Sequence, residues 1–129
     1  MNPTLPVFRL LLLVLGLAVP GSTPASGPAV HFGLARSAPA DKATVHALSE
    51  IRLWFTEGPS EGTVSVRLLD ASGAPVPTDD PARDAADAKV FSVQVSQPPA
   101  AGRYTVAWRG MGADGHVVRG GFTFTLAAH

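Results

Sequence analysis

The sequence predicts an all-β fold, a single antiparallel β-sandwich of about seven strands with Greek-key connections. Three observations predict it. Beyond residue 30, apolar and polar residues alternate over short segments, turn-forming residues separate these segments at roughly eight- to twelve-residue intervals, and no segment keeps a helical period. The chain has 129 residues, a length that suits one domain.

The first strands are indicated by residues 51–56 and 64–69, which place an apolar side chain at every second position. This alternation is typical of half-buried strands. A turn is expected at residues 70–73, where a glycine is available for a positive φ. Residues 74–77 are expected to be extended or to form an edge, because their prolines cannot donate to a strand ladder.

The second half of the chain alternates in the same way. Residues 78–88 are polar and carry four aspartates, so we expect an exposed loop with one helical turn after Pro81. Strands are predicted at residues 90–95, 104–108 and 122–126. Aromatic residues at strand period belong to the core in this interpretation: Phe55, Phe91, Tyr104, Trp108, Phe122 and Phe124.

The first 30 residues differ from the rest. One basic residue precedes an apolar run over residues 10–19, and small and turn-forming residues follow. This pattern predicts a signal peptide over residues 1–30, a β-sandwich domain over 31–129 and export to a bacterial periplasm. Cleavage is placed after Ala29 or after Val30. The run is shorter than the ~20 residues of a membrane-spanning helix, so no stable membrane insertion is expected.

Composition excludes several classes of function. Ten Lys and Arg residues balance ten Asp and Glu residues, so no general positive field would gather nucleic acid. The chain has no cysteine, which excludes disulfide scaffolds, thiolate metal sites and catalytic thiols. Nucleophile-elbow, phosphate-loop and dinucleotide motifs are absent, and Glu57 and Glu61 are interpreted as solvated loop carboxylates. We therefore do not expect an enzyme.

Histidine gives the most specific chemical indication. Asp114 and His116 are two residues apart, so in an extended segment their side chains share a face. His31 lies at or next to the predicted mature terminus, where a freed amino group can join its ring as a chelate. His46 and His129 are expected to be surface residues. The nitrogen and oxygen donors, without sulfur, favour Cu(II), then Ni(II), and Zn(II) less.

Four segments resemble the CopC family of periplasmic copper-resistance proteins. Residues 31–41 contain His-x-x-Leu followed by Ser-x-Pro-Ala-Asp, and residues 51–57 end in Phe-Thr-Glu. Residues 102–109 contain Gly-x-Tyr-x-Val-x-Trp-Arg, and residues 114–124 contain Asp-x-His with a downstream glycine and phenylalanine. The resemblance covers nearly the whole predicted mature chain.

The resemblance implies an immunoglobulin- or cupredoxin-like β-sandwich that binds one Cu(II) per chain. The family's ligands are the amine and ring of the first mature residue with the Asp and His of the closing motif. Here these are His31, Asp114 and His116. Val117 stands where the family usually has proline, and Gly112 where serine is common.

The leading hypothesis is a periplasmic, monomeric Cu(II)-binding protein of copper homeostasis. It would buffer copper or deliver it to an inner-membrane copper transporter or another cuproprotein. One alternative is a metal-free β-sandwich interaction module with a membrane partner, which Val30 and Val117 favour. A second is a copper-dependent oxidase, because an N-terminal histidine with a second histidine also resembles the copper brace of polysaccharide monooxygenases.

Overall fold

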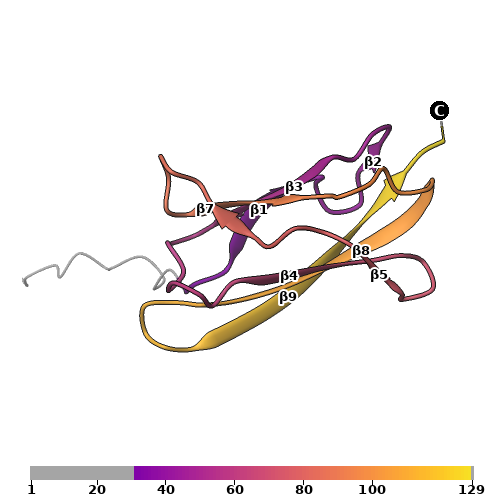
Figure 1. The fold of residues 1–129 in the computed structure, drawn as a ribbon. Helices are drawn as coiled ribbons and strands as arrows, with labels where there is room; N and C mark the ends of the chain where they lie inside the picture. The colour runs from indigo at the N-terminus through magenta and orange to yellow at the C-terminus, as the bar shows by residue number, and fades with distance from the viewer. Residues whose placement is uncertain (1–30, 129) are drawn as a thin grey trace, which may run out of the picture.

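Two β-sheets pack face to face and form the predicted sandwich (Figure 1). The computed structural model describes residues 31–128, so the predicted signal peptide at 1–30 and His129 lie outside the described residues. The four-stranded sheet has the order β1-β3-β7-β6, and the five-stranded sheet has the order β2-β9-β8-β4-β5. The strands are β1 (Leu34–Ala38), β2 (Thr44–Val45), β3 (Glu50–Phe55), β4 (Ser65–Leu69), β5 (Pro75–Val76), β6 (Ala82–Arg83), β7 (Val90–Gln94), β8 (Gly102–Met111) and β9 (Val117–Leu126).

The side chains that face the inside of the sandwich follow the predicted alternation of apolar and polar residues. Along β3, Ile51, Leu53 and Phe55 are buried and their neighbours are half-buried. All six aromatic residues that were assigned to the core are buried. Edge-on ring contacts of Phe55 with Trp108 and with Phe91, whose centroids are 5.5 and 5.8 Å apart respectively, fill part of the space between the sheets.

Two short strands depart from the expectations. The helical turn predicted after Pro81 is wrong, because residues 82–83 form β6 and pair with β7. The Asp84 carboxylate then accepts the backbone N–H groups of Ala86 and Asp87, which makes a side-chain-closed turn in place of a helical one. The sandwich is also not wholly antiparallel, since β2 pairs parallel to the end of β9.

The turn and edge predicted between β4 and β5 are confirmed. Gly73 has a φ of 83°, and β5 is a two-residue edge strand that pairs only with β4. Among residues 31–128, no helix is long and apolar enough to cross a membrane.

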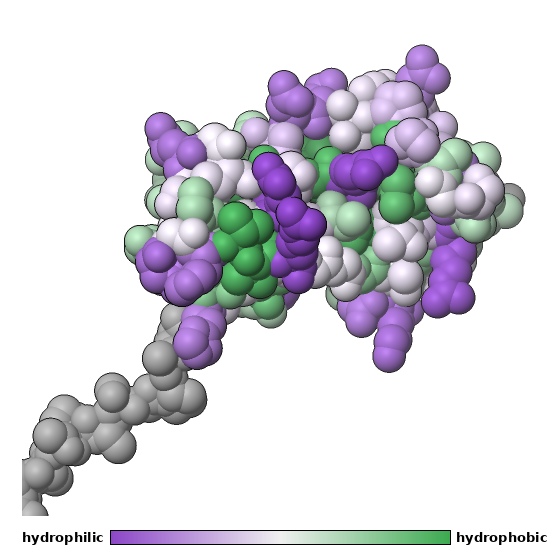
Figure 2. Space-filling view, turned by 90° about the horizontal axis from the view of Figure 1, so that it is seen from below, coloured by the Kyte–Doolittle hydropathy of each residue, from purple (hydrophilic) through white to green (hydrophobic). Residues whose placement is uncertain are grey.

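The β8–β9 hairpin positions the candidate site. Its two ten-residue strands pair continuously from Gly102↔Leu126 to Met111↔Val117. The turn that joins them lies at the same end of the sandwich as the start of the described chain (Figure 1). Seen from below, this end shows a hydrophobic cluster beside strongly hydrophilic side chains (Figure 2).

Candidate metal centre

Asp114 and His116 contact each other in the β8–β9 turn. His116 Nδ1 lies 2.9 Å from Asp114 Oδ2, and the His116 backbone N–H donates to Asp114 Oδ1 at 3.0 Å. Gly115 has a φ of 82°, and its N–H donates to the Gly112 carbonyl at 3.0 Å. The predicted proximity is therefore found, but a tight turn produces it and not an extended segment.

The two side chains change each other's protonation. The hydrogen bond to Asp114, followed by its negative charge, raises the pKa of His116, and the same contact lowers the pKa of Asp114. The side chains remain exposed, 83% for His116 and 60% for Asp114. Because Nδ1 is engaged with the carboxylate, Nε2 is the ring nitrogen of His116 left available to a ligand or metal.

His31 is held at the same end of the sandwich through its backbone. The Thr56 hydroxyl donates to the His31 carbonyl at 3.0 Å and accepts the Gly33 N–H at 3.0 Å. The next residue, Phe32, is 7% exposed and stacks on Phe55 with ring centroids 5.2 Å apart. The backbone of residue 31 is thus fixed, while its side chain is exposed.

Gly112 marks the point where the turn meets the start of the described chain. A Cβ placed on Gly112 would lie 2.8 Å from Phe32 Cβ, 2.7 Å from Glu57 Oε1 and 3.3 Å from Asp114 Oδ1. The Ala113 N–H also donates to Glu57 Oε1 at 3.3 Å. The turn that carries Asp114 therefore packs against both Phe32 and Glu57.

The sequence interpretation of Glu57 as a solvated loop carboxylate is incomplete. Glu57 lies in the loop after β3, but it is half-buried and its Oε1 accepts the Ala113 N–H of the turn that carries Asp114 and His116. Its position beyond β3 gave no spacing signal, because 56 residues separate it from Ala113. Only the Phe-Thr-Glu element of the family resemblance pointed to it. Glu61 is exposed, as expected, and so is His46.

The structure does not join all three predicted ligands. Within residues 31–128, no three histidine, aspartate or glutamate side chains come close enough together to hold a metal ion. Asp114 and His116 are in contact, whereas His31 lies at the same end without entering that contact. The available donors are imidazole nitrogen and carboxylate oxygen, a set whose chemistry fits Cu(II).

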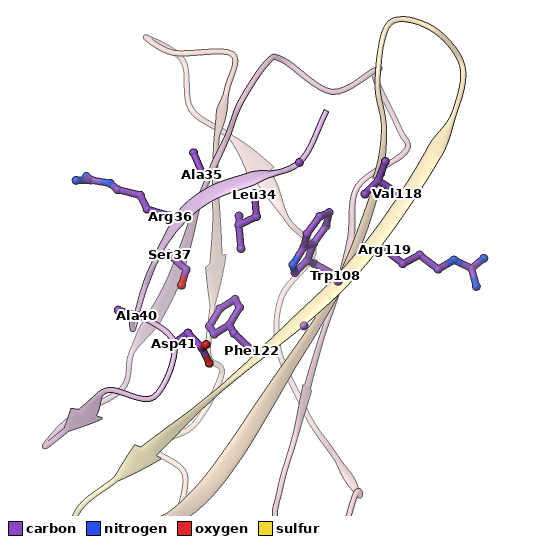
Figure 3. A pocket seen from close by; sticks show the side chains of 13 residues that line it. Leu34, Ala35, Arg36, Ser37, Ala40, Asp41, Trp108, Val118, Arg119 and Phe122 are labelled. Atoms are coloured by element: carbon purple, nitrogen blue, oxygen red, sulfur yellow. The ribbon is translucent and has the colours of Figure 1, made fainter. Parts of the chain in front are cut away.

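A separate groove of about 490 Å³ opens between β1 and β9 (Figure 3). Leu34, Trp108 and Phe122 point into it and give it an apolar floor, while Arg36 and Arg119 point away on either side. The three predicted metal ligands are not among its lining residues. The groove and the Asp114–His116 turn are therefore distinct features.

Comparison with known proteins identifies similar chains. The CopC domain family matches residues 34–127. "Copper resistance protein C" of Xanthomonas campestris pv. juglandis is 34% identical over 101 residues, covering 74% of this chain and 80% of that protein. "Protein YobA" of Escherichia coli strain K12 is 30% identical over 97 residues, covering 74% and 78%.

Two solved structures are similar in fold and sequence. CopC from Methylosinus trichosporium OB3b has a TM-score of 0.70 and 28% identity, and the match covers 77% of this chain and 96% of that one. PcoC, a methionine-rich copper resistance protein from Escherichia coli, has a TM-score of 0.69 and 30% identity, with 75% and 99% covered. The predicted resemblance and β-sandwich are both confirmed.

Proposed function

Because this chain belongs to the CopC family, in which its relatives include copper resistance proteins, we propose that it binds one Cu(II) ion through His31, Asp114 and His116. The observation that carries the proposal is the Asp114–His116 pair at an exposed hairpin turn, packed against the residue that follows His31. Two imidazoles and a carboxylate supply the nitrogen and oxygen donors that Cu(II) prefers.

His31 would contribute two donors. If the signal peptide is removed after Val30, residue 31 gains a free α-amino group that can chelate together with its own ring. The Thr56 hydroxyl and the buried Phe32 ring hold this backbone in place, which supports a preformed position for the chelate.

Asp114 would act in two ways. Its carboxylate orients the His116 ring through Nδ1 and leaves Nε2 for the metal. Its negative charge also reduces the net charge of the bound ion. Each Asp114 oxygen accepts one hydrogen bond from His116 and keeps a second lone pair, which is the one available to a metal ion.

The proposed role is copper handling in the periplasm without catalytic turnover. The ligands lie at one exposed end of the molecule, where an acceptor protein can reach the ion, and such exposure favours exchange over permanent storage. We propose that the chain acts as a monomer that buffers copper or delivers it to an inner-membrane transporter or another cuproprotein.

Native mass spectrometry of the protein isolated from the periplasm tests this proposal. We expect a mass that begins at His31 and gains one copper when Cu(II) is added. His116→Ala should lose the copper. His46→Ala should keep it and is the matched control, because His46 is exposed and directly follows β2, which pairs with the end of β9 farthest from the turn. A protein that begins at Val30 and retains no copper would overturn the proposal and favour the metal-free interaction module. Equal copper retention by both variants would also overturn it.

A further inference from the structure

The outer face of the five-stranded sheet has an unbalanced charge. The whole chain has as many acidic as basic residues, yet strands β4, β8 and β9 together contain four arginines and no aspartate or glutamate. Three of these, Arg67, Arg109 and Arg119, are exposed and lie near the turn that joins β8 to β9. We call these three the arginine face.

Strand register brings the three side chains together. Arg109 is paired directly with Arg119 across β8 and β9. On the other side of β8, Arg67 is paired with Ala107, so it stands diagonally next to Arg109. All three line one hollow of about 350 Å³. Ala107 and Gly120 also line this hollow, and because they are small they leave room between the arginines.

The arginine face has no counter-charge within the sandwich. Among residues 31–128, no carboxylate lies within ion-pairing distance of these arginines, whereas Arg52 pairs with Glu50 at 3.0 Å. Like charges directly opposite each other in a sheet are destabilising. The arrangement therefore costs the fold some stability, and a bound anionic group would remove that cost.

We propose that the arginine face docks an acidic segment of a partner protein. Guanidinium groups bind carboxylates through two parallel hydrogen bonds, so a cluster of arginines suits successive Asp or Glu side chains. The side chains of such a segment can enter the hollow between the arginines. By strand register, Val117, 54% exposed, and its strand partner Met111 lie on the same face and add apolar contact.

The arginine face lies next to the proposed copper ligands, so docking there would also favour copper transfer; this consequence rests on the proposed function. Val117 directly follows His116, so a partner docked here would lie beside the proposed copper ligands. The ion could then pass to the partner without crossing open solvent. The docking itself does not depend on the proposed copper ligands, because its charged contacts come from Arg67, Arg109 and Arg119.

An NMR titration of the metal-free protein with a hexaglutamate peptide tests the docking. We expect the largest shift changes at the amides of Ala107 and Gly120, between the arginines. The double variant Arg109→Gln/Arg119→Gln should weaken binding about tenfold. The charge-matched control Arg36→Gln/Arg103→Gln changes one arginine on β1 and one at the end of β8 away from the turn, and it should change binding less than about twofold.

Three results would overturn the proposal. Shift changes spread over the whole surface, or equal weakening by the two double variants, would show binding by general charge. Cosedimentation with phosphatidylglycerol vesicles that depends on the arginine face, in the absence of peptide binding, would assign it to a membrane. A clear loss of thermal stability in Arg109→Gln/Arg119→Gln would show a structural role, because relief of like charge should leave the melting temperature unchanged or raise it. Since no metal is present, none of these results depends on whether copper binds at His116.

Discussion

Thr56→Val tests the two side-chain hydrogen bonds that hold the start of the described chain to the residue after β3. The hydroxyl donates to the His31 carbonyl and accepts the Gly33 N–H, both at 3.0 Å, and valine keeps the shape while losing both hydrogen bonds. One such bond contributes about 0.5–1.5 kcal/mol net. Water can replace part of the exposed one, so we expect a loss of about 1–2 kcal/mol in the free energy of unfolding. For a domain of this size, the melting temperature should fall by about 5–15 °C.

Urea unfolding followed by tryptophan fluorescence measures this change. Thr125→Val is the matched control, because Thr125 is exposed on β9 and its effect should stay within about 0.5 kcal/mol. Thr56→Val should also weaken Cu(II) binding several-fold in a competition titration, since the backbone of His31 would no longer be held in advance. If Thr56→Val is as stable as the control variant, the anchoring of His31 through this hydroxyl is wrong.

Three further predictions concern pH and packing. Cu(II) affinity should fall as the pH drops through about 6.5 toward 5. Because Asp114 raises the pKa of His116, protons compete with copper at a higher pH than they would at a free imidazole. Constant affinity in titrations across this range would contradict histidine ligation. Asp70 accepts three hydrogen bonds within its turn, which lowers its pKa, so its stabilisation is full above the unfolded value and disappears as the pH falls through the lower folded value. Asp70→Asn should therefore melt below the wild type at pH ~7 but together with it at pH ~2, and a gap that persists in acid would contradict the assignment. Gly120→Ala would place a Cβ 2.6 Å from Trp108 Cζ2 and should cost about 1–3 kcal/mol in urea unfolding, and an unchanged midpoint would show that the Trp108 ring moves freely.

The long strands could be predicted because their signal is local. In β3 and β8, every second side chain faces the other sheet, and a two-residue period in the sequence reports this directly. Tyr104, Val106 and Trp108 follow the period and are buried. The same reasoning placed the turn at Gly73, because the positive φ there suits a residue without a Cβ.

The shortest strands could not be predicted because they depend on partners far along the chain. Residues 82–83 form a strand only through pairing with Phe91 and Ser92 of β7, and two residues carry no recognisable period. The aspartates around them indicated a loop, which is right for residues 84–89 but does not reveal the pairing. The parallel contact of β2 with β9 is hidden for the same reason, since residues 44–45 lie about 80 positions from their partners.

One contact of the candidate site could likewise be predicted from the sequence, and another could not. Asp114 and His116 are neighbours in sequence, so their contact could be expected from spacing alone. Glu57 meets the same turn from 56 residues away, and no local pattern indicates that approach. The chelating amine proposed for His31 depends on where the predicted signal peptide would be cut, which a processing enzyme and not the fold would set.

Gly112 connects the core of the sandwich to the proposed copper ligands. Phe32 is fixed by its stacking on Phe55, and the turn approaches it so closely that a Cβ at position 112 would stand 2.8 Å from Phe32 Cβ. Real Cβ atoms do not come this near to other carbon atoms, so the approach requires glycine at this position in the present geometry. The serine that is common in the family at this position would need the turn or Phe32 to shift by several tenths of an ångström. The distance between His31 and the Asp114 turn is therefore set by core packing through Phe32, and copper affinity should respond to substitutions in the core that never touch the metal.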